Sequence, residues 1–157
     1  MTTIINNTVI FQRLTDIRED MDLNQTKMAT KLGVSQATYS RWETGKEFIP
    51  LIKLNLFCNI TKHSMDYVTG LIPEEREHLK SATLDLVLIG SRIKIFRMKN
   101  HLFQYELAEF LNTTQSTISA YENGKTFMLT AFAYQIAKEY KVSLDWLCGR
   151  IQNEYNK

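Results

Sequence analysis

Two glutamines at corresponding places in the chain have a side chain well suited to reading a base pair. A glutamine amide presents a donor and an acceptor side by side, and this pair matches N6 and N7 of adenine in the major groove of DNA. Gln36 follows Ser35, and Gln115 follows Thr114. Both hydroxyl residues are good helix N-caps, so we expect each glutamine just inside the start of a helix, with its amide free to meet a base edge.

The residues after each glutamine differ in chemistry. Ala37 and Ser116 come next, and one helical turn further on stand Arg41 and Ala120. Arg41 could bind a guanine or a phosphate, whereas Ala120 can offer only an apolar contact to a thymine methyl group. The two segments should therefore prefer different sequences.

Two further pairs of residues suit contacts with phosphates. Gln25 and Gln104 are expected to begin the preceding helix, where a side-chain amide and free backbone N–H groups can hold a phosphate oxygen. A helix-capping role is the alternative for both. Lys46 and Lys125 each follow a glycine that ends a helix, and each would either neutralise a phosphate or remain solvated.

These pairs recur at a fixed interval because the sequence is duplicated. A shift of 79 positions aligns residues 13–70 with residues 92–149 without a gap, and 17 of the 58 columns are identical. Unrelated sequences of ordinary composition match in roughly 6% of columns. A repeat of about 60 residues is therefore present twice.

Each repeat is predicted to be helical. Apolar residues of the second repeat recur at three- and four-residue intervals, at Ile93, Phe96, Leu102, Leu107, Ala108 and Leu111. Gly33 and Asn112 stand where a helix would end in a left-handed conformation. A helix follows that contains the glutamine, then a fourth helix at 50–60 or 129–140, and then a short fifth one. Five short helices in about 60 residues predict a small all-α bundle.

A helix, a three-residue turn and a second helix form the arrangement that places one helix in the major groove. Residues Leu23–Lys46 and Gln104–Lys125 resemble the DNA-binding domain of the phage repressor and Cro family, also called the xenobiotic-response-element type. Val142–Leu147 is similar to the closing helix of that family. The resemblance covers about three quarters of the chain and implies two tandem five-helix, lambda-repressor-like helix-turn-helix domains.

The resemblance also implies roles for individual residues. Arg18 with Glu43, and Arg97 with Glu122, match an ion pair that joins the first helix of such a domain to the end of the third. The implied DNA contacts are Gln25, Ser35, Gln36, Ala37, Arg41 and Lys46 in the first repeat, and Gln104, Thr114, Gln115, Ser116, Ala120 and Lys125 in the second.

The first repeat departs from the second just before its second helix. It has four carboxylates, Asp16, Glu19, Asp20 and Asp22, at the positions of Ile95, Met98, Lys99 and His101. Carboxylates close to phosphates repel them, so this difference weakens the DNA affinity expected of the first repeat.

A helical connector is predicted at residues 72–89, between a first domain at 9–71 and a second at 90–151. Pro73 suits the first turn of a helix, and the acidic residues after it favour a helix start. Apolar residues then alternate by threes and fours, at Leu79, Ala82, Leu86, Ile89, Ile93 and Phe96. This stripe would pack on the two bundles or form the seam of a homodimer, and Gly90 is a candidate break in the helix.

The sequence does not support an enzyme, a metal-binding protein or a membrane protein. No Gly-x-Ser-x-Gly, His-Glu-x-x-His or glycine-rich phosphate loop is present, so we expect no catalytic residue and no enzyme. The histidines show no metal-ligand spacing, and neither a metal nor a cofactor is expected. The longest aliphatic run, Leu86–Ile89, is too short for a membrane helix or a signal peptide, which predicts a cytoplasmic protein.

We therefore expect a sequence-specific regulator of transcription that binds double-stranded DNA, and more specifically a repressor. A single chain could read two unlike half-sites, whereas a homodimer would read a palindrome. The alternative is a protein-interaction module, such as an antitoxin or an inhibitor of a defence enzyme, whose bundles bind a protein partner. The acid-rich first repeat and the apolar connector favour this alternative.

Overall fold

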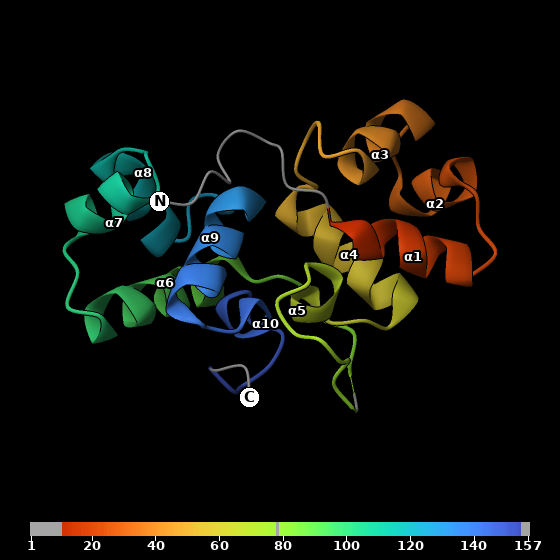
Figure 1. Cartoon of the computed structure of the whole chain (residues 1–157). Coiled ribbons are helices and arrows are strands. Elements are labelled where there is room, and N and C mark those ends of the chain that lie inside the picture. The colour runs from red at the N-terminus through yellow and green to blue at the C-terminus, as the bar shows by residue number, and fades with distance from the viewer. Residues whose placement is uncertain (1–10, 78, 155–157) are drawn as a thin grey trace. The chain divides into compact units, whose positions relative to one another are not determined.

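The computed structural model describes residues 11–77 and 79–154 of the 157-residue chain. Within these ranges the chain forms ten α-helices and no strand (Figure 1), which confirms the expected all-α fold. The chain divides into two compact units, Met1–Ser81 and Ala82–Lys157, and each contains five helices. The start expected for the first domain, at residue 9, lies outside the described residues. None of the helices in the described part has the length and the apolar run that crossing a bilayer would need.

The first unit packs its five helices around one apolar core. The helices are α1 (Gln12–Asp20), α2 (Gln25–Leu32), α3 (Gln36–Glu43), α4 (Leu51–Thr61) and α5 (Met65–Val68). Every one of these helices contributes a side chain that is completely or almost completely buried, namely Leu14, Met28, Leu32, Tyr39, Leu54, Phe57 and Met65. The expected break at Gly33 is present, because its φ of 70° lies in the left-handed region that glycine adopts without strain.

The second unit repeats this order of helices. They are α6 (Leu86–Lys99), α7 (Gln104–Phe110), α8 (Gln115–Glu122), α9 (Thr130–Tyr140) and α10 (Leu144–Leu147). Asn112, at the position of Gly33, adopts a φ of 55°, as its sequence position predicts. Thr114 Oγ1 accepts the N–H of Thr117 and so caps α8, as Ser35 Oγ caps α3 through the N–H of Thr38.

A repeated arginine ties the first helix of each unit to the last helix or to the segment that follows it. Arg13 Nη1 donates to the carbonyl oxygens of Tyr67 and Ile72, both at 2.6 Å. Arg92 Nη1 donates to the carbonyl oxygen of Ile151 at 2.7 Å. Both arginines belong to the identical columns of the repeat, so this closure was duplicated with the sequence.

The predicted helical connector is wrong for most of its length. Helix α6 begins only at Leu86, and residues 73–77 and 79–85 are not helical. Asp85 supplies the start signal, because its carboxylate accepts the N–H groups of Val87 and Leu88 at 2.9 and 3.2 Å.

Two side chains that follow Pro73 closely are bound to the first unit. Glu75 Oε2 accepts the N–H of Ser64 at 2.8 Å and lies 2.8 Å from His63 Nδ1. Arg76 Nη1 donates to the buried carboxylate of Asp66 at 2.7 Å. These tertiary bonds prevail over the local preference for a helix.

The apolar stripe expected along the connector therefore does not continue as one helix. Its last three members, Ile89, Ile93 and Phe96, are buried on α6, which contacts α8 and α10 within the second unit. Gly90 lies inside α6 and does not break it. A Cβ atom at Gly90 would lie 2.5 Å from the carbonyl oxygen of Tyr121, so glycine is needed for the end of α8 to lie against α6.

An ion pair joins the first and third helices of each unit, and it is buried in the first unit and partly buried in the second. In the first unit Arg18 Nε donates to Glu43 Oε2 at 2.7 Å and Nη2 to Oε1 at 3.1 Å, and both residues are buried. Arg18 Nη1 also donates to the carbonyl oxygen of Leu23 at 2.8 Å. In the second unit Arg97 Nε and Nη2 donate to the Glu122 carboxylate at 2.9 and 2.8 Å. Both of the ion pairs expected from the sequence are therefore present.

The Glu43 carboxylate is ionised in the folded protein. Burial opposes its charged form, but hydrogen bonds from Arg18 and Gln25 outweigh this effect and hold the pKa of Glu43 below its usual value. The same bond with Glu43 raises the pKa of Arg18. Two matched charges thus fix the end of α3 against α1.

We predict that Gly90→Ala destabilises the second unit by roughly 1–3 kcal/mol, because the added methyl group must displace the backbone of α8. Trp146 lies in the second unit and Trp42 in the first, so denaturant unfolding in a Trp42→Phe background would report the second unit by fluorescence. Ser91→Ala, at the next and exposed position of α6, is the control. An unchanged unfolding midpoint in Gly90→Ala would contradict the close packing.

We predict that Arg18→Met destabilises the first unit by on the order of 3–5 kcal/mol, because it leaves the Glu43 carboxylate buried without its partner. Trp42 fluorescence in a Trp146→Phe background would follow this unit. The double variant Arg18→Met/Glu43→Gln should lose less than the sum of the two single variants. Additive losses would show that the two side chains do not act as a pair.

Acidification should weaken the first unit through the same pair. The folded-state pKa of Glu43 lies below its unfolded value of about 4.3, so its stabilisation is complete above that value and is lost as the pH falls through the folded-state pKa. The unfolding free energy of the first unit should therefore fall below about pH 4.3. Glu43→Gln should show a smaller fall over this range, and an equal fall in both proteins would contradict the assignment.

Candidate nucleic-acid interface

The starts of the second and third helices lie side by side in the first unit. Gln36 Nε2 donates to Gln25 Oε1 at 2.7 Å, and Gln25 Nε2 donates to Glu43 Oε1 at 3.0 Å. Gln25 therefore connects the buried ion pair to the exposed amide of Gln36. This chain of hydrogen bonds orients the Gln36 side chain at the N-terminal end of α3.

The second unit repeats the inner part of this arrangement. Gln104 Nε2 donates to Glu122 Oε2 at 3.2 Å, as Gln25 does to Glu43. Gln115 is exposed at the start of α8 and makes no side-chain hydrogen bond within residues 11–77 and 79–154. Its amide therefore keeps both its donor and its acceptor available.

The remaining predicted contact residues lie on or next to the same two helices. In the first unit Ala37 is exposed on α3, and Lys46 is exposed in the turn after it. In the second unit Ser116 and Lys125 are exposed and Ala120 is partly exposed. Each unit thus presents its six predicted residues on two consecutive helices and the turns next to the second of them.

Arg41 has a partner that the sequence did not reveal. Its Nε donates to Glu47 Oε1 at 2.9 Å, and the two side chains are 42% and 49% exposed. Its Nη2 also donates to Thr38 Oγ1 at 3.3 Å. In the second unit Ala120 and Thr126 occupy the positions of Arg41 and Glu47, so only the first unit has a guanidinium here and a carboxylate that competes for it.

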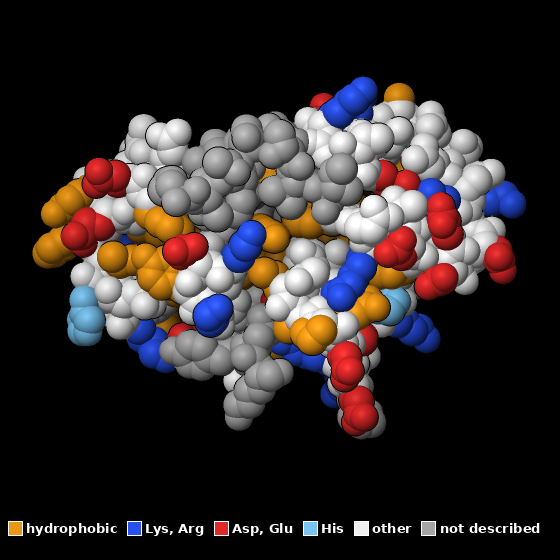
Figure 2. Space-filling model, in the orientation of Figure 1, with side chains coloured by type: hydrophobic (Ala, Val, Ile, Leu, Met, Phe, Trp, Pro, Cys, Tyr) orange, Lys and Arg blue, Asp and Glu red, His pale blue; other side chains and the backbone are white. Residues whose placement is uncertain are grey.

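Charge is distributed differently over the two equivalent segments. Residues 24–46 contain four cations, Lys27, Lys31, Arg41 and Lys46, against the single carboxylate of Glu43. Residues 103–125 contain the single cation Lys125 against three carboxylates, Glu106, Glu109 and Glu122. Figure 2 shows several acidic side chains of the first unit where α1 lies, and others at the lower edge of the view. The carboxylates of α1 are thus followed along the chain by a basic segment that contains Gln36.

Phe103 and Tyr105 are surface residues that the sequence reasoning missed. They flank Gln104 and are 65% and 55% exposed. A comparison of the two repeats could have found them, because Asn24 and Thr26 occupy these positions in the first repeat. No three histidine, cysteine, aspartate or glutamate side chains of the described residues are grouped so that they could hold a metal ion.

Comparison with known proteins identifies both units. A family model described as a helix-turn-helix matches residues 14–54, and another described as a helix-turn-helix domain matches residues 90–151. The chain is also similar to YobD of Bacillus subtilis (strain 168), an uncharacterised HTH-type transcriptional regulator, with 31% identity over 74 residues. This match spans 44% of the chain and 66% of the relative. With two matched domains and an all-helical fold, the chain is a tandem helix-turn-helix protein of the xenobiotic-response-element type.

Proposed function

We propose that the chain is a sequence-specific regulator that binds double-stranded DNA through α3 and α8. The supporting observation is the exposed glutamine at the start of each of these helices. In the first unit it is hydrogen-bonded to Gln25 at the start of the preceding helix. A HTH-type relative named as a transcriptional regulator supports the same function. We further propose repression, because two DNA-binding units that occupy an operator can block transcription without any other activity.

The proposed contacts are of two kinds: some recognise bases, and others position the helices on the DNA. Gln36 and Gln115 would bind adenine, and Ala120 would contact a thymine methyl group. Arg41 would take a guanine or a phosphate. The residues proposed to position the helices on phosphates and at the groove edge are Gln25, Ser35, Ala37 and Lys46 in the first unit, and Gln104, Thr114, Ser116 and Lys125 in the second.

The two units would read different half-sites. Arg41 and Ala120 are equivalent positions with unlike chemistry, and only the first unit has the Gln25 to Gln36 hydrogen bond. A single chain would then recognise a bipartite site whose halves differ in sequence, with the centres of the half-sites about 10 base pairs or a multiple of this apart.

A protein-interaction module is the second candidate function. The exposed aromatic side chains of Phe103 and Tyr105 favour it, because aromatic residues are enriched in protein interfaces. The salt dependence of binding distinguishes the two functions. Duplex DNA binding by the full chain should weaken by at least about tenfold between 50 and 200 mM salt, since phosphate contacts release counterions. An absence of DNA binding at the lower salt concentration would contradict the proposed regulator and favour the protein module.

We predict that Gln36→Ala and Gln115→Ala each weaken binding to a cognate duplex by roughly 1–3 kcal/mol. The loss should disappear on a duplex in which the contacted adenine is replaced, because no bidentate contact then remains to be lost. Gln152→Ala, beyond α10, is the matched control. Unchanged base preference in both variants would refute the assigned roles.

We predict that Glu47→Gln strengthens DNA binding and steepens its salt dependence by about one unit of logarithmic slope. The substitution releases Arg41 from its carboxylate partner and removes a negative charge close to the proposed interface. Glu74→Gln makes the same charge change in the connector and should have a smaller effect. Equal effects of the two substitutions would show that Glu47 does not restrain Arg41.

A further inference from the structure

Two exposed lysines of α2 have no part in the contacts proposed above. The side chains of Lys27 and Lys31 have no hydrogen-bond or ion-pair partner within residues 11–77 and 79–154. The two lysines are four residues apart in one helix, so their side chains lie on the same face of it. Like charges at this spacing repel each other, so the stability of the helix does not explain the pair.

Helix α2 begins beside the side chain proposed to read a base. Gln25, in the first turn of α2, is hydrogen-bonded to Gln36 at 2.7 Å. Lys27 lies in the same turn as Gln25, and Lys31 lies one turn further on. In the docking geometry of a helix-turn-helix, the helix before the reading helix crosses the DNA backbone. Lysine side chains are long and flexible, so both can reach phosphates on that side of the groove.

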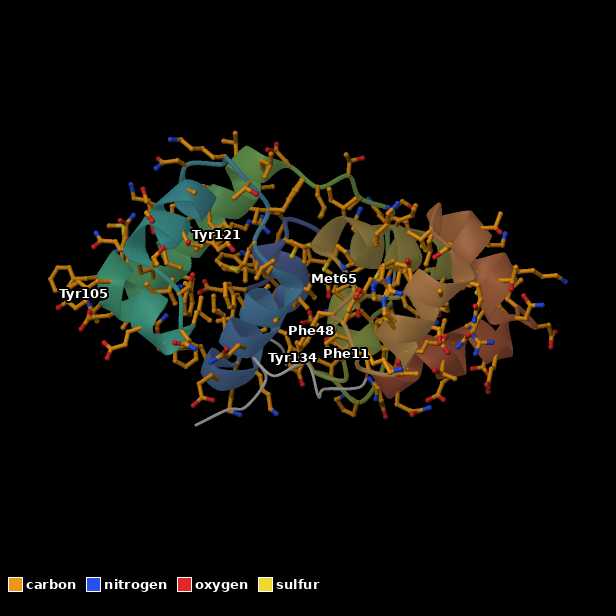
Figure 3. The ribbon with its side chains drawn as sticks, turned by 90° about the horizontal axis from the view of Figure 1, so that it is seen from above. Phe11, Phe48, Met65, Tyr105, Tyr121 and Tyr134 are labelled. Carbon is orange, nitrogen blue, oxygen red and sulfur yellow. The ribbon has the colours of Figure 1, made fainter. Side chains whose placement is uncertain are left out.

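The second unit has no such pair of lysines. Glu106 and Phe110 occupy the positions of Lys27 and Lys31. Figure 3 shows Tyr105, the neighbour of Glu106, pointing away from the second unit, so the first turn of α7 lies at the surface. A carboxylate in this turn repels the phosphates that a lysine would attract.

The charges without an ionic partner differ in sign between the two units. Glu43 and Glu122 are each held by the arginine of their ion pair, and Arg41 is paired with Glu47. Among the described residues, the charges that remain on α2, α3 and the turn after them are all positive, namely Lys27, Lys31 and Lys46. Those that remain on α7, α8 and the turn after them are Glu106, Glu109 and Lys125.

The lysines of α2 offset the acidic residues that were expected to weaken DNA binding by the first unit. Two of these carboxylates lie beside a donor: Asp16 Oδ1 accepts a hydrogen bond from Gln12 Nε2 at 3.1 Å, and Glu19 lies 3.8 Å from Arg18 Nη2. All four carboxylates belong to α1 or the turn after it, whereas the lysines belong to the helix proposed to cross the DNA backbone.

We propose that Lys27 and Lys31 bind phosphates, so that the first unit supplies most of the salt-dependent DNA affinity of the chain. This inference rests on the proposed function, because it assumes that the start of α2 faces DNA. The connector then keeps the second unit close to DNA that the first unit has bound. The second unit can therefore read its half-site with few phosphate contacts of its own.

The salt dependence of duplex binding by the full chain tests this proposal. The probe is a fluorescently labelled pool of random-sequence duplexes, titrated by anisotropy between 50 and 200 mM salt, because binding to such a pool depends on phosphate contacts. Lys27→Gln/Lys31→Gln should weaken binding at least about tenfold at 100 mM salt and reduce the logarithmic salt slope by about 1.8 units. Lys27→Arg/Lys31→Arg keeps both charges and should retain the wild-type slope.

A matched control separates these contacts from a change in net charge. Lys80→Gln/Lys138→Gln removes two exposed lysines from the connector and α9, and should reduce the slope much less. An equal reduction in the two double variants, or an unchanged slope in Lys27→Gln/Lys31→Gln, would overturn the inference alone. A wild type that binds no duplex at 50 mM salt would overturn the proposed function as well.

The second unit provides the converse test. Glu109→Gln removes an exposed carboxylate of α7 and should strengthen binding, whereas Glu139→Gln makes the same charge change on α9 and should have a smaller effect. Each variant should keep the circular dichroism spectrum of the wild type, because all of these side chains are exposed. Weaker binding in Glu109→Gln would contradict the assigned difference between the units.

Discussion

The ion pair of arginine and glutamate between the first and third helices is the interaction on which the rest of each unit depends. Arg18 and Glu43, like Arg97 and Glu122, fix the end of the third helix against the first. The same carboxylate accepts a hydrogen bond from Gln25 or Gln104 and so holds the start of the second helix. One charged pair therefore sets the relative positions of all three helices that a reading surface needs.

The two repeats share this helix packing and differ in their exposed side chains. The repeated arginines Arg13 and Arg92 close each unit in the same way, and the turns at Gly33 and Asn112 share a left-handed conformation. Several exposed positions differ between the repeats: Asp16 and Glu19 on the first helix have the apolar counterparts Ile95 and Met98, and Arg41 has an alanine as its counterpart. A shared helix packing with different surfaces fits two units that recognise different half-sites.

Sequence patterns predicted those features that depend on local chemistry. Caps, left-handed turns and periodic apolar residues specify the helices, and the two repeats supported each other. The connector failed because Glu75 and Arg76 form bonds with residues about ten positions earlier in the chain, which no local pattern reveals. Glu47 and the stacked pair of Phe103 and Tyr105 were missed for a related reason. The periodicity of apolar residues predicts which side chains form the core. The contacts of an exposed side chain depend on residues that are close in space but not in sequence, so periodicity does not predict them.

The central claim is that α3 and α8 read base pairs, each in its own half-site. Selection of duplexes from a randomised DNA pool by the full chain, at about 150 mM salt, tests it most directly, because specific binding there exceeds non-specific binding by about a thousandfold or more. The account predicts an enriched motif with two spaced blocks of different sequence. Enrichment of no motif, after repeated rounds with a folded protein, would contradict it.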